Sequence, residues 1–153
     1  MKVIATFASH FGAKMALNPE SVIKKEQRYY LINPRVRKLL RNDFLYAGLY
    51  LGEVKSGTLY PSFNLLNMLV DSASNKVVLD RKSAWLFICG RDVFKKGISR
   101  YFGARQKGQY VLVLNEFGEC LGFGKIIENL DILDNKLVIE NLFDVGDFLR
   151  RER

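Results

Sequence analysis

Hydrophobic positions near the start of the chain recur at helical spacing. They are separated by one, three or four residues and comprise Val3, Ile4, Phe7, Phe11 and Met15. This period predicts an amphipathic helix, which we expect to end at Asn18-Pro19. A second helix is predicted after Ser62, a plausible N-cap, because Leu65, Leu66, Leu69 and Val70 form one apolar stripe.

Extended segments and turns lie between these helices. Residues 21–33 are expected to be extended, with an apolar part at 29–32, and Asn33-Pro34 should open a short helix because proline suits a first helical turn. Residues 44–55 have the β-propensity and length of a strand that ends in the turn Lys55-Ser56-Gly57. The short helix carries Arg35, Arg37, Lys38 and Arg41, which are most simply a solvated face.

The second half of the chain is predicted to be mostly strands. Residues 84–88 form a continuous apolar run, as in a strand covered on both faces, and residues 110–115 and 120–127 flank a loop of hairpin length. A further strand is expected at 136–143, before a turn and the final segment FLRRER. A run of strands with one short helix predicts a small closed or half-closed β-barrel. The small, polar residues 71–76 mark the boundary, so we predict an α+β protein with a mixed α/β domain at 1–75 and a barrel domain at 77–153.

The charge of the chain points to an anionic partner. It has 153 residues, 48% of them hydrophobic, with a net charge of +8 and a pI near 9.6. Nucleic acid is the commonest partner of such a protein, and an anionic membrane surface is the minor alternative. The longest apolar run, residues 44–52, is half the length of a membrane helix, and the N-terminus is too interrupted by polar residues for a signal peptide. We therefore expect a soluble, cytoplasmic protein.

Most of the excess charge lies in one short segment. Six cations and one acid, Asp92, occupy residues 91–107, which concentrates five net charges in seventeen residues. The cations are Arg91, Lys95, Lys96, Arg100, Arg105 and Lys107. On a compact basic helix and the glycine-bounded loop after it, they can contact phosphates. Tyr101 and Phe102 could stack on unpaired bases, although core packing is the alternative and the one we expect for Phe102.

The sequence offers little for catalysis or metal binding. Cys89 and Cys120 have no CxxC spacing and lie in apolar runs, so we expect buried, reduced thiols. With His10 as the only histidine, neither a structural zinc site nor an imidazole base is expected. GxSxG, P-loop and HExxH motifs are absent. Gly122 and Gly124 could leave a groove for a nucleotide or a backbone, or mark a barrel corner or bulge, and no dinucleotide site is predicted. We expect no enzyme, metal or cofactor.

Three motifs in the second half resemble a known family. They are KSAWLFICGRDVFKKGISRY, VLVLNEFGECLGFGKI and DVGDFLRRER. Together they are similar to a PUA domain, an RNA-binding pseudo-barrel of RNA-modification and ribosome-assembly proteins. Their order most resembles the Nip-seven-like ribosome-biogenesis factors, of an archaeal type, which join an α/β N-terminal domain to a C-terminal PUA domain.

The resemblance implies a function and further site residues. It implies a non-enzymatic factor that binds pre-ribosomal RNA of the large subunit, takes part in its processing and contacts other ribosome-assembly proteins. Lys136 matches a basic position of the family's RNA surface, and Arg150 and Arg151 fall in the terminal motif. Glu140 and Phe143 stand at positions where archaeal relatives often have lysine. The RNA-binding face is therefore expected to depend more on Lys95, Lys96, Arg100 and Arg105, or else the affinity for RNA is expected to be weak.

Two other functions fit the same sequence. In the first, the protein is an interaction adaptor whose N-terminal domain docks a partner and whose barrel is structural. In the second, the barrel is the RNA-binding appendage of a modifying enzyme, for which the remaining 75 residues without a catalytic motif are too few. If four to six phosphates are neutralised, the slope of log K against log salt for single strands should be about −3 to −4.

Overall fold

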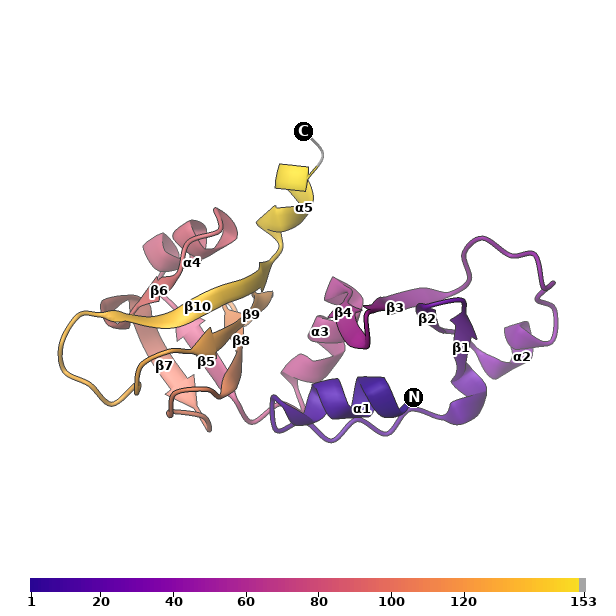
Figure 1. Ribbon diagram of the computed structural model, residues 1–153, viewed down its shortest axis with the longest axis horizontal. Helices are drawn as coiled ribbons and strands as arrows, with labels where there is room; N and C mark the ends of the chain where they lie inside the picture. Colours follow the sequence, from indigo (N-terminus) through magenta and orange to yellow (C-terminus); the bar gives the residue numbers. More distant parts are fainter. Residues whose placement is uncertain (152–153) are drawn as a thin grey trace.

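The computed structural model of the protein describes residues 1–151, apart from the side chains of residues 148, 149 and 151. The chain forms two sheets, with helices packed between and around them (Figure 1). No helix in the described range is both long enough and apolar enough to cross a membrane.

The first sheet belongs to residues 1–75, which we call the N-terminal half. It is antiparallel, in the order β1-β2-β3-β4. Its strands are β1 (Val22–Lys25), β2 (Arg28–Leu31), β3 (Leu49–Lys55) and β4 (Thr58–Pro61). The helices of this half are α1 (Lys2–Ser9), the 3-10 turn η1 (Pro19–Ser21), α2 (Pro34–Arg37) and α3 (Phe63–Val70).

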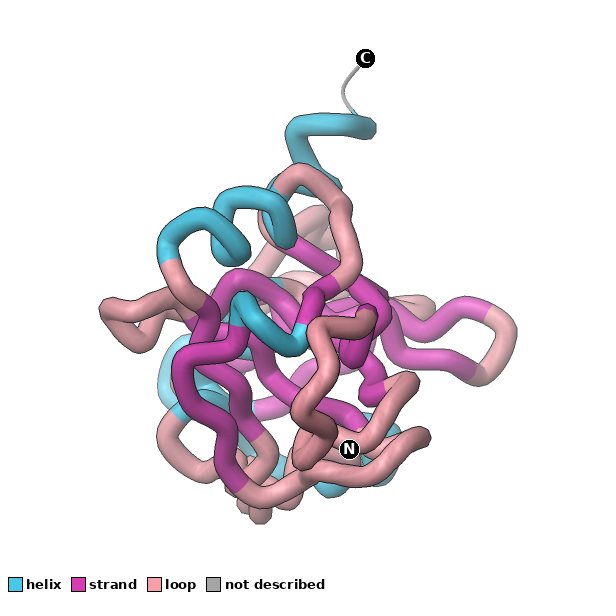
Figure 2. The backbone as a smooth tube through the Cα atoms, turned by 90° about the vertical axis from the view of Figure 1, so that its left-hand side faces the viewer, coloured by secondary structure: helices cyan, strands magenta, loops and turns pink. Residues whose placement is uncertain are grey.

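The second sheet belongs to residues 76–151, the C-terminal half, and has the order β6-β10-β9-β8-β5-β7. Its strands are β5 (Lys76–Leu79), β6 (Val93–Phe94), β7 (Ile98–Phe102), β8 (Tyr110–Leu114), β9 (Cys120–Ile126) and β10 (Leu137–Asp144). The other elements are α4 (Arg81–Ile88), the 3-10 turn η2 (Lys95–Gly97) and α5 (Gly146–Arg151). The edge strands β6 and β7 are joined by η2 alone, so the sheet must curl, as Figure 2 shows. The predicted α+β architecture with a half-closed barrel is confirmed.

The two halves share a hydrophobic core. From α1 and α3 and the residues beside them, Phe11, Leu66 and Leu69 pack against Leu112 of β8 and Phe123 of β9. All but Phe123, which is 9% exposed, are fully buried. A separate cluster fills the inside of the curled sheet, and a third lies between α1 and the N-terminal sheet. The shared cluster stabilises the position of one half against the other.

Several local predictions are confirmed by their hydrogen bonds. The Ser62 hydroxyl accepts from the Leu65 amide at 3.2 Å and caps α3. The Asn33 side chain accepts from the Arg35 amide at 2.9 Å, and Pro34 occupies the first turn of α2. The predicted turn at Ser56-Gly57 closes a tight antiparallel hairpin. Residues 21–33, expected to be extended, instead contain a second hairpin in which a turn at Glu26-Gln27 separates β1 from β2.

Several predicted elements differ in the structure. The first helix ends at Ser9 and not near Asn18, so Phe11 and Met15 pack from irregular chain. The strand expected at 44–55 begins only at Leu49, after Gly48 with a φ of +64°. The expected basic helix after Gly90 is strand β6 followed by the single turn η2.

The strand predicted at 84–88 is the second turn of helix α4. The Asp80 carboxylate accepts from the Ser83 amide at 2.7 Å and caps the N-terminus of this helix. The prediction missed the helix because five consecutive apolar residues are also typical of a covered strand. Ala84 and Phe87, three residues apart, are buried, whereas Trp85 is 64% exposed. One face of the helix, and not the whole run, is therefore covered.

The two cysteines differ in environment, and the prediction that both are buried was wrong for Cys89. Cys89 caps the C-terminus of α4 and is exposed, whereas Cys120 is half-buried. Burial raises the pKa of the Cys120 thiol to about 11.

We expect the two thiols to react at different rates. Because the thiolate is the nucleophile, Cys120 will be almost wholly unreactive toward a disulfide reagent near pH 8, whereas exposed Cys89 will react promptly. In a thiol titration of the native protein, one thiol per chain should react rapidly, and the second should react only after the protein is unfolded. Replacement of Cys89 by serine should remove the fast phase, and a fast phase that survives it would contradict this assignment.

Candidate nucleic-acid interface

The predicted RNA-binding cations fall into separate groups. Five of them surround the connection between β9 and β10, residues 127–136. We call this group the loop patch, and it consists of Lys95, Lys96, Arg105, Lys107 and Lys136. Four of its members come from the segment singled out in the sequence, and Lys136 comes from the far side of the loop.

Backbone hydrogen bonds hold η2 against this loop. The Lys95 amide donates to the Lys136 carbonyl at 2.8 Å, and the Lys96 amide donates to the Asn135 side chain at 3.1 Å. The Lys95 ammonium donates to the Leu130 carbonyl at 2.5 Å. Lys95 therefore stabilises the loop, while Lys96 is exposed and, among residues 1–151, has no ion pair.

The segment after β7 meets the loop from the other side. The Leu130 amide donates to the Arg105 carbonyl at 2.9 Å, and the Gly108 amide donates to the Ile126 carbonyl at 2.7 Å. These bonds place exposed Lys107 in the turn beside the end of β9. The strand pairing and the loop, and not spacing along the chain, therefore bring the five cations together.

Tyr101 forms the centre of a small polar cluster in the loop patch. Its hydroxyl donates to the Asp131 carboxylate at 2.6 Å, which raises the pKa of Tyr101. The Lys95 ammonium lies 4.7 Å from the ring centroid, and the Arg105 guanidinium lies 5.7 Å from it. Arg105 also approaches Asp131 at 3.8 Å. The ring is thus already contacted by cations of the protein.

Acidic residues of the loop offset part of the charge. Glu128, Asp131 and Asp134 lie among the five cations, which leaves a net charge of +2. Lys136 approaches Asp134 at 3.9 Å, but both side chains are well exposed and such a pair contributes little. The patch is therefore a moderately basic surface.

Arg91 and Arg150 lie elsewhere, near the C-terminal end of β10. The Asn141 side-chain Nδ2 donates to the Arg91 carbonyl at 3.4 Å, and the Arg150 guanidinium donates to the Asp144 carboxylate at 2.8 Å. Lys136, in contrast, precedes the first residue of β10. An eight-residue strand spans about 23 Å, so these two arginines and the loop patch lie toward opposite ends of β10.

Arg150 is engaged in an internal clamp. Its guanidinium donates to the Ile88 carbonyl at 2.7 Å and to buried Asp144, which raises the pKa of Arg150. Asp144 also accepts from the Asn141 side chain and the Asp147 amide. Arg150 therefore ties α5 to the end of α4, and positions the corner at Gly90 that precedes β6. The side chain of Arg151 lies outside the described residues.

Arg100 lies apart from both groups, on the edge strand β7. It pairs with Val78 of β5, and Phe102 pairs with Lys76. Phe102 is 45% exposed, so the core position expected for it was wrong, whereas Tyr101 is partly buried against the core. The segment 91–107 thus crosses the half-barrel and places its cations in three locations.

Gly122 and Gly124 allow β10 to approach β9 closely. A Cβ at Gly122 would lie 1.9 Å from the Phe143 carbonyl oxygen, and one at Gly124 would lie 2.5 Å from that of Glu140. The register between these strands shifts between Asn141 and Phe143. Of the alternatives considered, the structure supports a close backbone approach at a bulge, and not a nucleotide groove.

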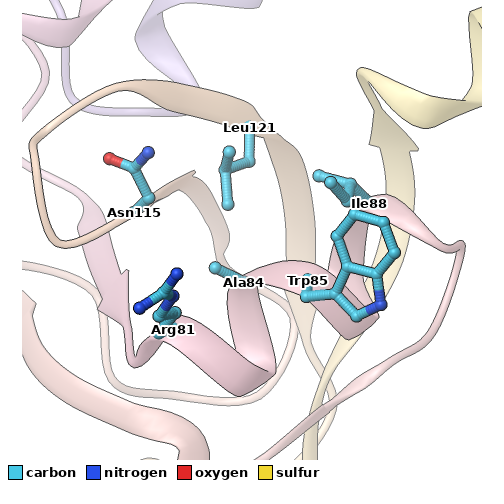
Figure 3. Close-up of a pocket in the computed structure, with 6 residues that line it drawn as sticks. All are labelled: Arg81, Ala84, Trp85, Ile88, Asn115 and Leu121. Atoms are coloured by element: carbon cyan, nitrogen blue, oxygen red, sulfur yellow. The ribbon is translucent and has the colours of Figure 1, made fainter.

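The sequence analysis missed an exposed tryptophan, Trp85, beside a shallow pocket at α4. A shallow pocket of about 380 Å³ is lined by Arg81, Ala84, Trp85, Ile88, Asn115 and Leu121 (Figure 3). Because residues 84–88 were predicted to be a strand covered on both faces, Trp85 was expected to be buried. The signal that could have revealed it is the Asp80 cap followed by apolar residues at helical spacing.

Comparison with known proteins identifies a matching family and a relative of similar length. A family model described as the UPF0113 PUA domain matches residues 75–153. A UPF0113 protein of Archaeoglobus fulgidus is 28% identical over 163 aligned positions, covering 100% of this chain and 91% of that protein.

Two solved structures have the same fold. A conserved PUA domain protein from Thermoplasma acidophilum is 21% identical, with a TM-score of 0.66, and the match covers 99% of this chain and 92% of that one. A hypothetical protein from Pyrococcus horikoshii is 18% identical, with a TM-score of 0.63 and the same coverage. Each match extends through the N-terminal half, so these proteins share the fold of the whole chain.

Proposed function

This chain belongs to the UPF0113 PUA domain family, and on that premise we propose that it binds RNA through its C-terminal half without catalysing a reaction. The observation that carries the proposal is the loop patch, where five cations from two distant segments meet at one end of a half-barrel. Cations on a rigid scaffold supply affinity through phosphate contacts.

The structure also suggests which residues contact the phosphates. Lys95 is occupied by the Leu130 carbonyl, so the exposed members of the loop patch would make the contacts: Lys96, Arg105, Lys107 and Lys136. The net charge of +2 fits modest affinity. Single-stranded RNA is favoured as the ligand because Phe94, which is 50% exposed, precedes η2 and pairs with Leu137 beside Lys136, and so offers a face on which an unpaired base can stack.

The cellular role that we propose is in assembly of the large ribosomal subunit. It is supported by the resemblance of the three C-terminal motifs to Nip-seven-like factors and by the arrangement of an α/β half before a PUA half. In this role the protein accompanies pre-ribosomal RNA and other assembly proteins in the cytoplasm. Crosslinking in its own cells, followed by sequencing of the bound RNA, tests this role: recovery of large-subunit RNA supports it, and recovery of unrelated RNA rejects it.

The proposed mechanism has a measurable dependence on salt. With four phosphates neutralised, log K for a mixed-sequence single-stranded RNA should fall against log salt with a slope of about −3. Fluorescence anisotropy of a labelled oligonucleotide between about 50 and 200 mM salt measures the slope. An affinity independent of salt would contradict phosphate binding.

A further inference from the structure

The N-terminal half presents an exposed apolar loop at the end of the molecule far from the C-terminal sheet (Figure 1). It comprises the last three residues of α2 and the chain after it, residues 35–46, which we call the tip loop. Leu39 is 80% exposed, Leu45 is 88% exposed and Tyr46 is 62% exposed. Single exposed leucines are common, but three large apolar side chains within eight residues are a feature that needs an explanation.

The contacts that hold the tip loop against the rest of the N-terminal half do not involve Leu39 or Leu45. The Arg37 guanidinium donates to the carbonyls of Pro19 and Glu20, at 3.2 and 2.8 Å. The Lys25 ammonium donates to the Phe44 carbonyl and lies 4.6 Å from the centre of that ring. The conformation of the loop is therefore supported from beneath, and folding does not account for Leu39 and Leu45.

A turn places the two leucines on either side of one short reversal of the chain. The Phe44 amide donates to the Arg41 carbonyl at 3.3 Å. Leu39 precedes this turn and Leu45 follows it. Next to them, the Tyr46 ring rests edge-on against the buried Tyr30 ring, with centroids 5.3 Å apart. An exposed leucine thus stands on each side of the turn.

The charges of the tip loop select the partner. It has four cations and one acid, Asp43, which pairs with Arg41 at 3.5 Å. Among residues 1–151, Arg35 and Lys38 have no ion pair, and both are exposed. A net charge of +3 in a segment with three exposed apolar side chains is complementary to an acidic surface that also bears apolar groups.

We propose that the tip loop is a docking site for an acidic segment of a partner protein whose apolar side chains cover Leu39, Leu45 and Tyr46. Tyrosine and arginine around a desolvated apolar centre are typical of protein interfaces. RNA would satisfy the cations, but phosphates gain nothing from burying aliphatic side chains, so the leucines favour a protein. This surface is separate from the loop patch and extends the proposed function from RNA to a protein partner.

Site-specific photo-crosslinking in the protein's own cells tests the proposal. With a photoreactive amino acid in place of Leu45, we expect a discrete protein adduct whose crosslinked peptide contains more Asp and Glu than Lys and Arg. The change R35E with K38E should reduce the yield of this adduct by about tenfold or more, because two attractions become repulsions. The matched change K2E with K14E alters the net charge equally at exposed positions outside the tip loop and should leave the yield unchanged.

Every other result overturns the proposal. These results are an RNA adduct, an adduct with a second copy of the chain, a crosslinked peptide without excess acid, no adduct above that obtained with the photoreactive residue at exposed Lys14, and equal loss in both charge variants. RNA affinity of the R35E and K38E variant, measured separately by anisotropy, distinguishes this failure from failure of RNA binding by the C-terminal half.

Discussion

Replacement of both Lys96 and Lys107 by glutamate should weaken binding of single-stranded RNA by about a hundredfold at low salt. The reason is that two phosphate contacts are lost and two repulsions replace them, and the slope of log K against log salt should become shallower by about 1.4. Both side chains are exposed and, in the described part of the chain, neither has an ion pair, so the fold should be unaffected. Fluorescence anisotropy over a salt series measures both quantities.

The control for this change must alter the net charge equally at another surface. Replacement of Lys2 and Lys14 by glutamate does so in the N-terminal half, and should reduce RNA affinity only slightly. Lys95 is unsuitable for the test because its ammonium donates to the Leu130 carbonyl, and its reversal would disturb the loop itself. Equal loss of affinity in the test and control variants would show that the loop patch is not the binding surface.

Replacement of Phe11 by alanine should lower the free energy of unfolding by about 3 to 5 kcal/mol. Phe11 is fully buried in the cluster shared by the two halves, where its ring lies 5.2 Å from that of Phe7 and 5.6 Å from that of Phe123. Truncation would leave a cavity between α1 and β9 that the surrounding side chains fill only in part. Urea denaturation followed by circular dichroism measures the loss.

Phe117 provides a matched control for the core change. It is 80% exposed at the tip of the β8–β9 hairpin, and its replacement by alanine should change the free energy of unfolding by less than about 0.5 kcal/mol. A loss below about 1 kcal/mol for the Phe11 variant would mean that the shared cluster does not stabilise the fold, since truncation of a packed core phenylalanine costs several times more.

Elements with strong local chemistry were predictable from the sequence. The caps at Asn33 and Ser62 and the hairpin turn at Ser56-Gly57 follow from hydrogen bonds and backbone preferences that neighbouring residues decide. The segment 84–88 was not predictable in this way. Five consecutive apolar residues fit a covered strand as well as a helix, and only packing on one face shows that Trp85 is exposed.

The sequence predicted most of the cations of the candidate interface but not which of them share a surface. The sequence located a basic segment at 91–107, and most of the loop patch comes from it. It could not show that Arg100 and Arg91 lie elsewhere, or that Arg150 clamps α5 to the carbonyl of Ile88. The placements of Arg91 and Arg150 depend on β10, which pairs with both β6 and β9 although it is far from β6 along the chain. The placement of Arg100 depends on the pairing of β7 with β5.

The sequence by itself determined the α+β class, the excess of positive charge and the resemblance to a PUA domain. These properties follow from composition, local periodicity and short motifs, which depend on near neighbours in the chain. Only the tertiary structure decided which cations share a surface and which leucines remain uncovered. The physical reason is that strand pairing and burial bring together residues tens of positions apart in the chain. The order of the strands in the sheet, and not their order in the sequence, therefore decides at which end of the half-barrel a charge lies.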